Sequence, residues 1–116
     1  MSELIIYHNS RCSKSRQTLA LLEQQDITIT IIDYLKTPPT AETVHTLLQQ
    51  LGFTARQLLR KSEAIYKELN LKDNSFSDEQ LIQAMCEHPK LIERPIVIYN
   101  GVAKIGRPPE SVLELL

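Results

Sequence analysis

Hydrophobic positions in the first third of the chain change from a short apolar run to helical spacing and back. The apolar run from Leu4 to His8 precedes a turn signal, which is typical of a buried strand. Helical spacing continues to about Gln25, and the β-branched run from Thr28 to Asp33 predicts a second strand. A strand, helix and strand in this order predict a right-handed unit with two parallel strands.

The middle of the chain, from about residue 40 to 88, keeps helical spacing and offers no strand candidate. A helix is expected to begin at Thr40 and to end at Gly52. Thr54 and Ser77 each precede a glutamine by three residues, which is the capping-box pattern of a helix start, and Ser62 is expected to cap a short helix between them. This stretch is therefore predicted to be a helical insertion.

The last third returns to strands, because the apolar runs Pro95–Tyr99 and Val102–Ile105 flank Asn100-Gly101. Asn-Gly between two such runs is a strong hairpin signal. A final helix is expected to begin at Pro108-Pro109. The order β-α-β, helical block, β-β-α resembles the thioredoxin and glutaredoxin plan. We therefore expect an α/β fold with a mixed sheet, forming a single domain over residues 1–116 with a helical insertion at about 40–88.

Composition excludes several classes of function. The 116 residues carry 13 Lys+Arg and 14 Asp+Glu, and this net charge of -1 gives no basic field for nucleic acid. No apolar run is long enough to cross a membrane, and no signal peptide is visible. Two cysteines far apart do not make a disulfide framework, so a reducing cytoplasmic location is expected. Neither a metal site nor a bound cofactor is expected.

Cys12 lies between the end of the first predicted strand and the start of the first predicted helix, with Arg11 and Lys14 close by in sequence. A thiol at a helix start among cations has a lowered pKa, which favours the reactive thiolate. The alternative is a small buried hydrophobe, as free cysteines often are. The polar, basic surroundings favour a nucleophile. Three polar residues are plausible caps of the following helix: Asn9, Ser10 and Ser13.

The segment Cys12–Ser15 forms a C-x-x-S motif, so a second thiol for a dithiol reaction is missing at Ser15. The Ser15 hydroxyl can instead donate a hydrogen bond to a thiolate and favour that form. Thr18 stands where a phosphatase loop requires an arginine. Cys86, the only other cysteine, is interpreted as a core or incidental residue. Cys12 is thus a monothiol nucleophile, and any arginines that bind an oxyanion must come from elsewhere in the chain.

Three arginines are candidates for that role: Arg60, Arg94 and Arg107. Guanidinium groups suit tetrahedral oxyanions because they donate two parallel hydrogen bonds and keep their charge. Arg94 and Arg107 each precede a proline, at element ends that the thioredoxin plan places near Cys12. In that plan Pro95 faces the cysteine, typically through a cis peptide bond. The alternative for each arginine is an ordinary surface side chain.

At these residues the sequence resembles the glutaredoxin-coupled arsenate reductase family, ArsC. The matching segments cover nearly the whole chain: Ile6-Tyr7-His8-Asn9, Cys12 with Ser15-Arg16 and Thr18-Leu19, Tyr34-Leu35 with Pro38-Pro39, Leu58-Leu59-Arg60-Lys61, His88-Pro89, Arg94-Pro95-Ile96-Val97 and Arg107-Pro108. The sequence departs from the family pattern at Ser10-Arg11, where Pro-Ala is common, and at Gly106, where some members carry another residue.

The resemblance implies that Cys12 attacks arsenate and forms a thiol-arsenate adduct. The three arginines would hold the oxyanion, His8 would influence the acidity of the thiol, and Ser15 would place its hydroxyl near the thiolate. Glutathione would be the co-substrate and glutaredoxin the protein partner, and the protein would act as a monomer. Two alternatives stay open. One is a glutathione-dependent thiol reductase with another substrate. The other is a partner-binding protein like the Spx-type regulators of RNA polymerase, although those commonly carry C-x-x-C.

Overall fold

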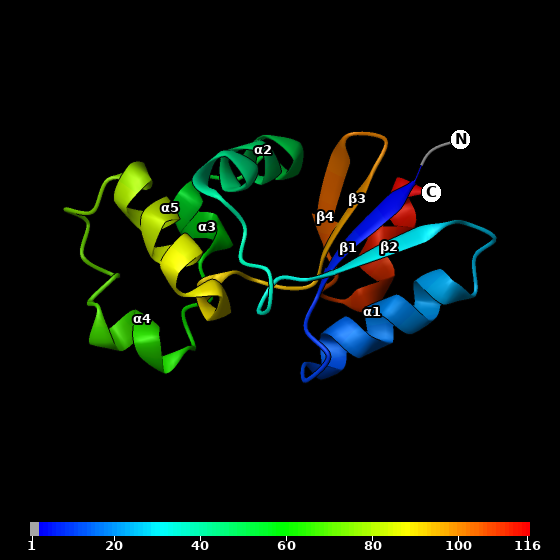
Figure 1. Cartoon of the computed structure of the whole chain (residues 1–116), viewed down its shortest axis with the longest axis horizontal. Helices are drawn as coiled ribbons and strands as arrows, with labels where there is room; N and C mark the ends of the chain where they lie inside the picture. The colour runs from blue at the N-terminus through cyan, green and yellow to red at the C-terminus, as the bar shows by residue number, and fades with distance from the viewer. Residues whose placement is uncertain (1–2) are drawn as a thin grey trace. The chain divides into compact units, whose positions relative to one another are not determined.

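The computed structural model describes residues 3–116 and divides into two compact units (Figure 1). The sheet unit comprises the chain through Thr37 together with Arg94–Leu116. The helical unit comprises Pro38–Glu93 and contains the stretch predicted as an insertion. None of the helices within residues 3–116 is long and apolar enough to span a membrane.

The sheet unit is built on four strands in the order β2-β1-β3-β4: β1 (Leu4–His8), β2 (Ile29–Asp33), β3 (Ile96–Tyr99) and β4 (Val102–Ile105). β1 runs parallel to β2 and antiparallel to β3, and β3 is antiparallel to β4. The mixed sheet is therefore confirmed. Asn100 and Gly101 have φ of 54° and 78°, as the tight turn between β3 and β4 requires.

One face of this sheet is covered by α1 (Ser13–Glu23) and η2 (Pro109–Leu115), which pack against each other (Figure 1). The fully buried side chains of this core are Leu4, Ile6, Leu22, Val97 and Val112. Alternate residues of β1 supply two of them, because successive side chains of a strand point to opposite faces. The predicted final helix is present as a 3₁₀ helix.

The helical unit contains α2 (Ala41–Leu51), α3 (Ala55–Leu58), α4 (Ala64–Glu68), α5 (Asp78–Glu87) and the 3₁₀ helix η1 (Pro89–Leu91). α5 packs against α2, α3 and η1. The core of the unit is formed by buried aliphatic side chains, among them Val44, Leu47, Leu58, Leu81, Ile82, Met85 and Leu91. This unit therefore has an apolar core of its own.

The helix starts in this unit follow the sequence prediction at three positions and depart from it at one. Thr40 is the N-cap of α2, as expected. Thr54 and Ser77 form complete capping boxes at α3 and α5. Ser62 was expected to cap α4, but the N-cap is Glu63, which makes no side-chain cap hydrogen bond. Arg60 holds the Glu63 side chain in an ion pair, and α4 begins after that residue. Gly52 ends α2 with φ 72°, as predicted.

Candidate active site

Cys12 is itself the N-cap of α1, with extended backbone dihedrals, and the caps predicted at Asn9, Ser10 and Ser13 are wrong. Asn9 instead holds the preceding loop together. Its side-chain oxygen accepts a hydrogen bond from the Arg11 amide, and its carbonyl accepts one from the Cys12 amide, both at 3.0 Å. The thiol therefore stands at the first turn of α1, where several backbone N–H groups have no partner within the helix.

The pKa of the Cys12 thiol lies below its ordinary value. Partial burial acts in the opposite direction and is the largest single influence, since it disfavours the charged thiolate. It is outweighed by the backbone N–H groups of Ser15 and Lys14 and by the guanidinium of Arg94, which contributes both a hydrogen bond and its charge. The thiol is thus more acidic than a free cysteine, as the sequence predicted. The causes differ from the expected ones, because Arg94 and two backbone N–H groups act on the sulfur rather than the side-chain charges of Arg11 and Lys14.

Arg94 and Arg107 lie beside Cys12. Nη2 of Arg107 is 3.4 Å from Sγ of Cys12, and its Nε donates to the Arg94 carbonyl oxygen at 2.9 Å. Both arginines precede a cis proline, at Pro95 and Pro108. The cis bond before Pro95 was expected, whereas the one before Pro108 was not. Two guanidinium groups from distant segments therefore converge on one sulfur atom.

His8 and Ser15 form a buried pair at the end of β1 and the start of α1. Nδ1 of His8 is 2.6 Å from Oγ of Ser15, and the same oxygen accepts a hydrogen bond from the Asn9 amide at 3.0 Å. Burial lowers the pKa of His8, and the charge of Arg16 adds to this, while Asp33 and Glu23 raise it. The balance favours a neutral imidazole, whose Nδ1 can accept the Ser15 proton.

This arrangement differs from the sequence expectation for Ser15. The hydroxyl was expected to donate to the Cys12 thiolate, but it is directed to His8. The backbone N–H of Ser15 is the group that acts on the sulfur. Ser15 thus contributes to the acidity of Cys12 through its place in the first turn of α1.

Thr18 and Gly106 join α1 to the segment that carries Arg107. Oγ1 of Thr18 lies 2.8 Å from the Lys14 carbonyl oxygen and 3.4 Å from that of Gly106. A Cβ atom at Gly106 would lie 2.4 Å from Oγ1 of Thr18 and 2.8 Å from Cγ of Pro95. Only glycine fits this contact without movement of its neighbours. The sequence analysis missed this role, and neither residue type signals it.

Arg60 belongs to the helical unit, where two carboxylates hold its side chain. Nε lies 3.1 Å from Glu63, and Nη1 lies 3.1 Å from Glu93. Burial acts to lower the pKa of Arg60, but the charges of Glu93 and Glu63 and the hydrogen bonds that Arg60 donates to both carboxylates raise it. The Arg60 amide also donates to the Leu91 carbonyl oxygen at 2.6 Å. Cys12, Arg94 and Arg107 thus lie together in the sheet unit, and Arg60 lies in the other unit.

The two carboxylates at Arg60 were also missed by the sequence analysis. Glu63 stands three residues after Arg60, a spacing at which side chains can pair and which could have revealed it. Glu93 is 33 residues away and carries no local signal. An antiparallel bridge between Leu59 and Ile92 brings the two segments together, so folding creates this pair.

A family model, described as the ArsC family, matches residues 7–115 of the chain. The chain belongs to the ArsC family. It is 48% identical over 114 residues to a protein of Haemophilus influenzae named arsenate reductase, covering 97% of this chain and 98% of that one. It is 57% identical over 112 residues to the Escherichia coli (strain K12) protein YfgD, whose name states no activity, covering 96% and 94%.

Among solved structures, the arsenate reductase from Vibrio cholerae superposes on this ArsC-family chain with a TM-score of 0.96. The two are 57% identical, and the match covers 98% of each. An ArsC family related protein from Bacteroides fragilis has 22% identity and a TM-score of 0.83, a likeness that shows the fold alone. The thioredoxin-like fold and the family resemblance found in the sequence are both confirmed.

Proposed function

We propose that this ArsC-family protein reduces arsenate to arsenite, with Cys12 as the nucleophile. The observation that carries the proposal is the acidic thiol at the start of α1 with Arg94 and Arg107 beside it. Arsenate at neutral pH is a multiply charged anion, so a thiolate can approach it only where cations offset that charge. Relatives named arsenate reductase support the choice of substrate.

In the proposed first step, Sγ of Cys12 attacks arsenic. A sulfur–arsenic bond forms, one arsenic–oxygen bond breaks, and the oxygen leaves as water after taking up two protons from solvent. Arg94, Arg107 and, in this proposal, Arg60 hold the remaining oxygens. Backbone N–H groups at the start of α1 supply further donors, since the N-terminus of a helix favours anions.

In the proposed second step, the thiolate of glutathione attacks Sγ of Cys12. A disulfide forms, the sulfur–arsenic bond breaks, and its electron pair reduces arsenic(V) to arsenic(III), which leaves as arsenite. A glutaredoxin thiolate then attacks the glutathione sulfur of this disulfide and releases Cys12 as a thiolate. An external thiol is needed because Ser15 stands where a resolving cysteine would be.

The proposed cycle uses glutathione as a co-substrate and needs no bound cofactor. Cys86 has no part in it, because burial and the charge of Glu87 raise the pKa of that thiol. The groups proposed to act on arsenate all belong to one chain, so a monomer suffices. The reaction also requires a compartment with reduced glutathione, which makes the cytoplasm the proposed location.

The test is an assay that couples arsenate reduction to NADPH oxidation through glutathione reductase. Arsenate-dependent oxidation is expected only when both glutathione and glutaredoxin are present. Cys12→Ser should abolish it, and the matched control Cys86→Ser should retain it. Absence of arsenate-dependent turnover, in a preparation whose Cys12 is shown to be acidic, would contradict arsenate as the substrate.

The ion pairs of Arg60 support a second candidate function, in which this arginine does not bind the substrate. Glu63 and Glu93 offset the charge that this arginine would offer to an oxyanion. A glutathione-dependent thiol reductase with another substrate would need Cys12 but not Arg60. Reduction of a small glutathione mixed disulfide that persists in Arg60→Ala and Arg107→Ala, together with negligible arsenate turnover by the unmodified chain, would favour this candidate.

A further inference from the structure

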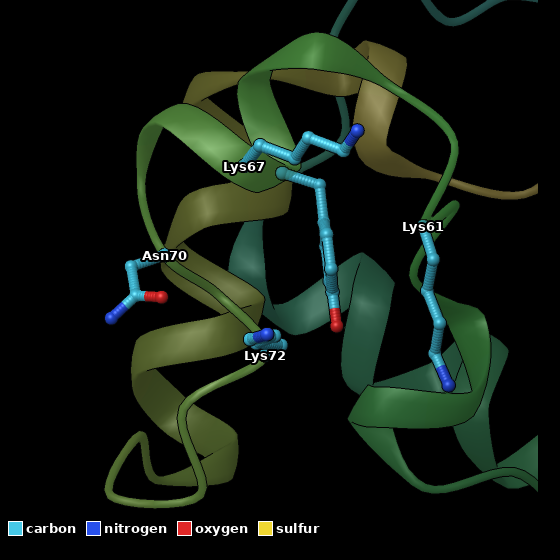
Figure 2. A pocket seen from close by; sticks show the side chains of 5 residues that line it. Lys61, Lys67, Asn70 and Lys72 are labelled. Carbon is cyan, nitrogen blue, oxygen red and sulfur yellow. The ribbon is translucent and has the colours of Figure 1, made fainter.

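The helical unit contains a cavity of about 340 Å³ that shares no residue with the group around Cys12 (Figure 2). It is lined by Lys61, Tyr66, Lys67, Asn70 and Lys72. Sites for small organic molecules usually have volumes of about 300 to 1,000 Å³. The cavity is therefore large enough for a small ligand.

The charge of this cavity is of one sign. Three of its five lining residues are lysines, and none is acidic. Within residues 3–116, the ammonium groups of Lys61, Lys67 and Lys72 form no ion pair or hydrogen bond, in contrast to Lys104, which pairs with Glu114. Like charges around one hollow repel one another, and a bound anion would relieve that repulsion.

The backbone that carries Lys67 and Lys72 is held in place by buried neighbours. Tyr66 and Leu71 are buried, and each is followed directly by an exposed lysine. Asn70, with φ 53°, turns the chain between them, and the Leu71 amide donates to the Tyr66 carbonyl oxygen at 3.0 Å. Nη1 of Arg56 donates to the Leu71 carbonyl oxygen at 2.8 Å. Lys67 and Lys72 thus stand on a fixed backbone rather than on a loose loop.

Lys61 lies on the loop before α4, Lys67 on α4 and Lys72 on the segment after it (Figure 2). The three lysines thus belong to one continuous stretch of chain that bends around the cavity they line. Lysine is a compact point charge on a flexible stem and does not demand the planar, two-oxygen geometry that arginine matches. Such a site selects a ligand by charge and size, and Tyr66 adds an aromatic ring to the lining.

We propose that this cavity binds a small organic anion that carries two or more phosphate or carboxylate groups. The three lysines favour a ligand with several negative charges. The volume of the cavity and the aromatic ring of Tyr66 favour a ligand that also has an organic skeleton. This site is independent of the chemistry at Cys12, so the proposal stands or fails apart from the proposed arsenate reduction.

The test is a titration followed by the amide signals of the ¹⁵N-labelled chain, with ATP and with citrate as separate probes and adenosine as the uncharged control. Saturable shifts are expected at the five lining residues, with a Kd below about 1 mM for at least one anion. Replacing Lys61, Lys67 and Lys72 together by glutamine should weaken binding at least about tenfold. The matched control Lys36→Gln, an exposed lysine of the sheet unit, should bind as the unmodified chain does.

A response to ATP shows that phosphates suffice, and a response to citrate shows that carboxylates suffice. The proposal is overturned if neither probe shifts the pocket signals. Shifts that persist in the triple variant, or that adenosine produces equally, also overturn it. Because all three lysines are exposed, the triple variant should keep the dispersed spectrum of the folded chain, which the same experiment records.

Discussion

The side chain of Arg94 connects the acidity of Cys12 to a segment that is distant in sequence. Burial of the thiol raises its pKa, and Arg94 is among the groups that more than offset this effect. A lowered pKa means that the thiolate is populated at lower pH than in a free cysteine. Cysteine reactivity therefore reports on this contact directly.

We predict that alkylation of Cys12 rises with pH at a midpoint below that of a free cysteine. Arg94→Gln should move this midpoint upward and slow alkylation at neutral pH, because a hydrogen bond and a positive charge are lost. The control Arg11→Gln removes an exposed neighbouring cation and should leave the midpoint nearly unchanged. The pH dependence of iodoacetamide labelling measures both. A midpoint equal to that of free cysteine in the unmodified chain would contradict the prediction.

The Ser15 hydroxyl offers a second prediction at this scale. Ser15→Ala keeps the backbone N–H that acts on Cys12 but leaves the Asn9 amide and His8 Nδ1 without their shared partner. We expect the free energy of unfolding to fall by about 1–3 kcal/mol, while the alkylation midpoint stays close to that of the unmodified chain. Chemical denaturation and alkylation test the two parts. A large upward shift of the midpoint would show that the hydroxyl serves the thiolate instead, and Ser13→Ala is the exposed control.

At the scale of elements, the N-caps of α5 and α4 show which helix starts can be predicted from the local sequence and which cannot. The capping box at Ser77 depends on residues within one turn, so the pattern in the sequence sufficed. Ser62 has a capping residue type, yet α4 starts after Glu63. The ion pair between Glu63 and Arg60 is a contact that residue type alone does not reveal.

This contrast predicts unequal effects of two similar substitutions. Ser77→Ala should lower the free energy of unfolding by about 1 kcal/mol, because the Gln80 amide loses its acceptor. Ser62→Ala should change it by less than about 0.5 kcal/mol, since Ser62 caps nothing and is exposed. Urea denaturation of the two variants makes the comparison. Equal losses would contradict the assignment of the N-caps.

The contact of α1 with the segment before Arg107 predicts a steric effect. Gly106→Ala should destabilise the chain by about 1–3 kcal/mol, because its Cβ would lie 2.4 Å from Oγ1 of Thr18. It should also slow alkylation of Cys12 by displacing Arg107 from the sulfur. Adding Thr18→Ala removes the nearest clashing atom, so the double variant should lose less stability than the sum of the two single ones. Additive losses in the denaturation curves would contradict this direct contact.

At the scale of the whole molecule, the chain comprises two compact units, and the residues proposed to bind the substrate come from both. Cys12, Arg94 and Arg107 belong to the sheet unit, and Arg60 belongs to the helical unit. Thermal unfolding of the complete chain measures whether arsenate uses both sets of groups, because a ligand that binds only the folded state raises the midpoint.

We expect arsenate to raise the unfolding midpoint of the unmodified chain. Arg107→Ala and Arg60→Ala should each reduce that rise, since each removes a cation proposed to contact the anion. Differential scanning calorimetry with and without arsenate, with sulfate as a control anion, provides the measurement. If arsenate raises the unfolding midpoint of Arg60→Ala as much as that of the unmodified chain, Arg60 does not bind arsenate. The proposed roles of Cys12 and Arg107 would then be unaffected.

By itself, the sequence predicted the elements of this protein and indicated Cys12 as the candidate nucleophile. Periodicity and turn chemistry predicted the strands and the helical insertion, because these signals act over a few residues. The mixed sheet was expected from the resemblance of the element order to the thioredoxin and glutaredoxin plan. Cys12 could be recognised as a reactive thiol because two of the groups that act on it, the backbone N–H groups of Lys14 and Ser15, lie within three residues of it. The tertiary structure decided the partners. Arg107 reaches Cys12 across 95 positions, and Ser15 binds His8 rather than the thiol, because long-range packing chooses among polar partners that local sequence leaves equivalent.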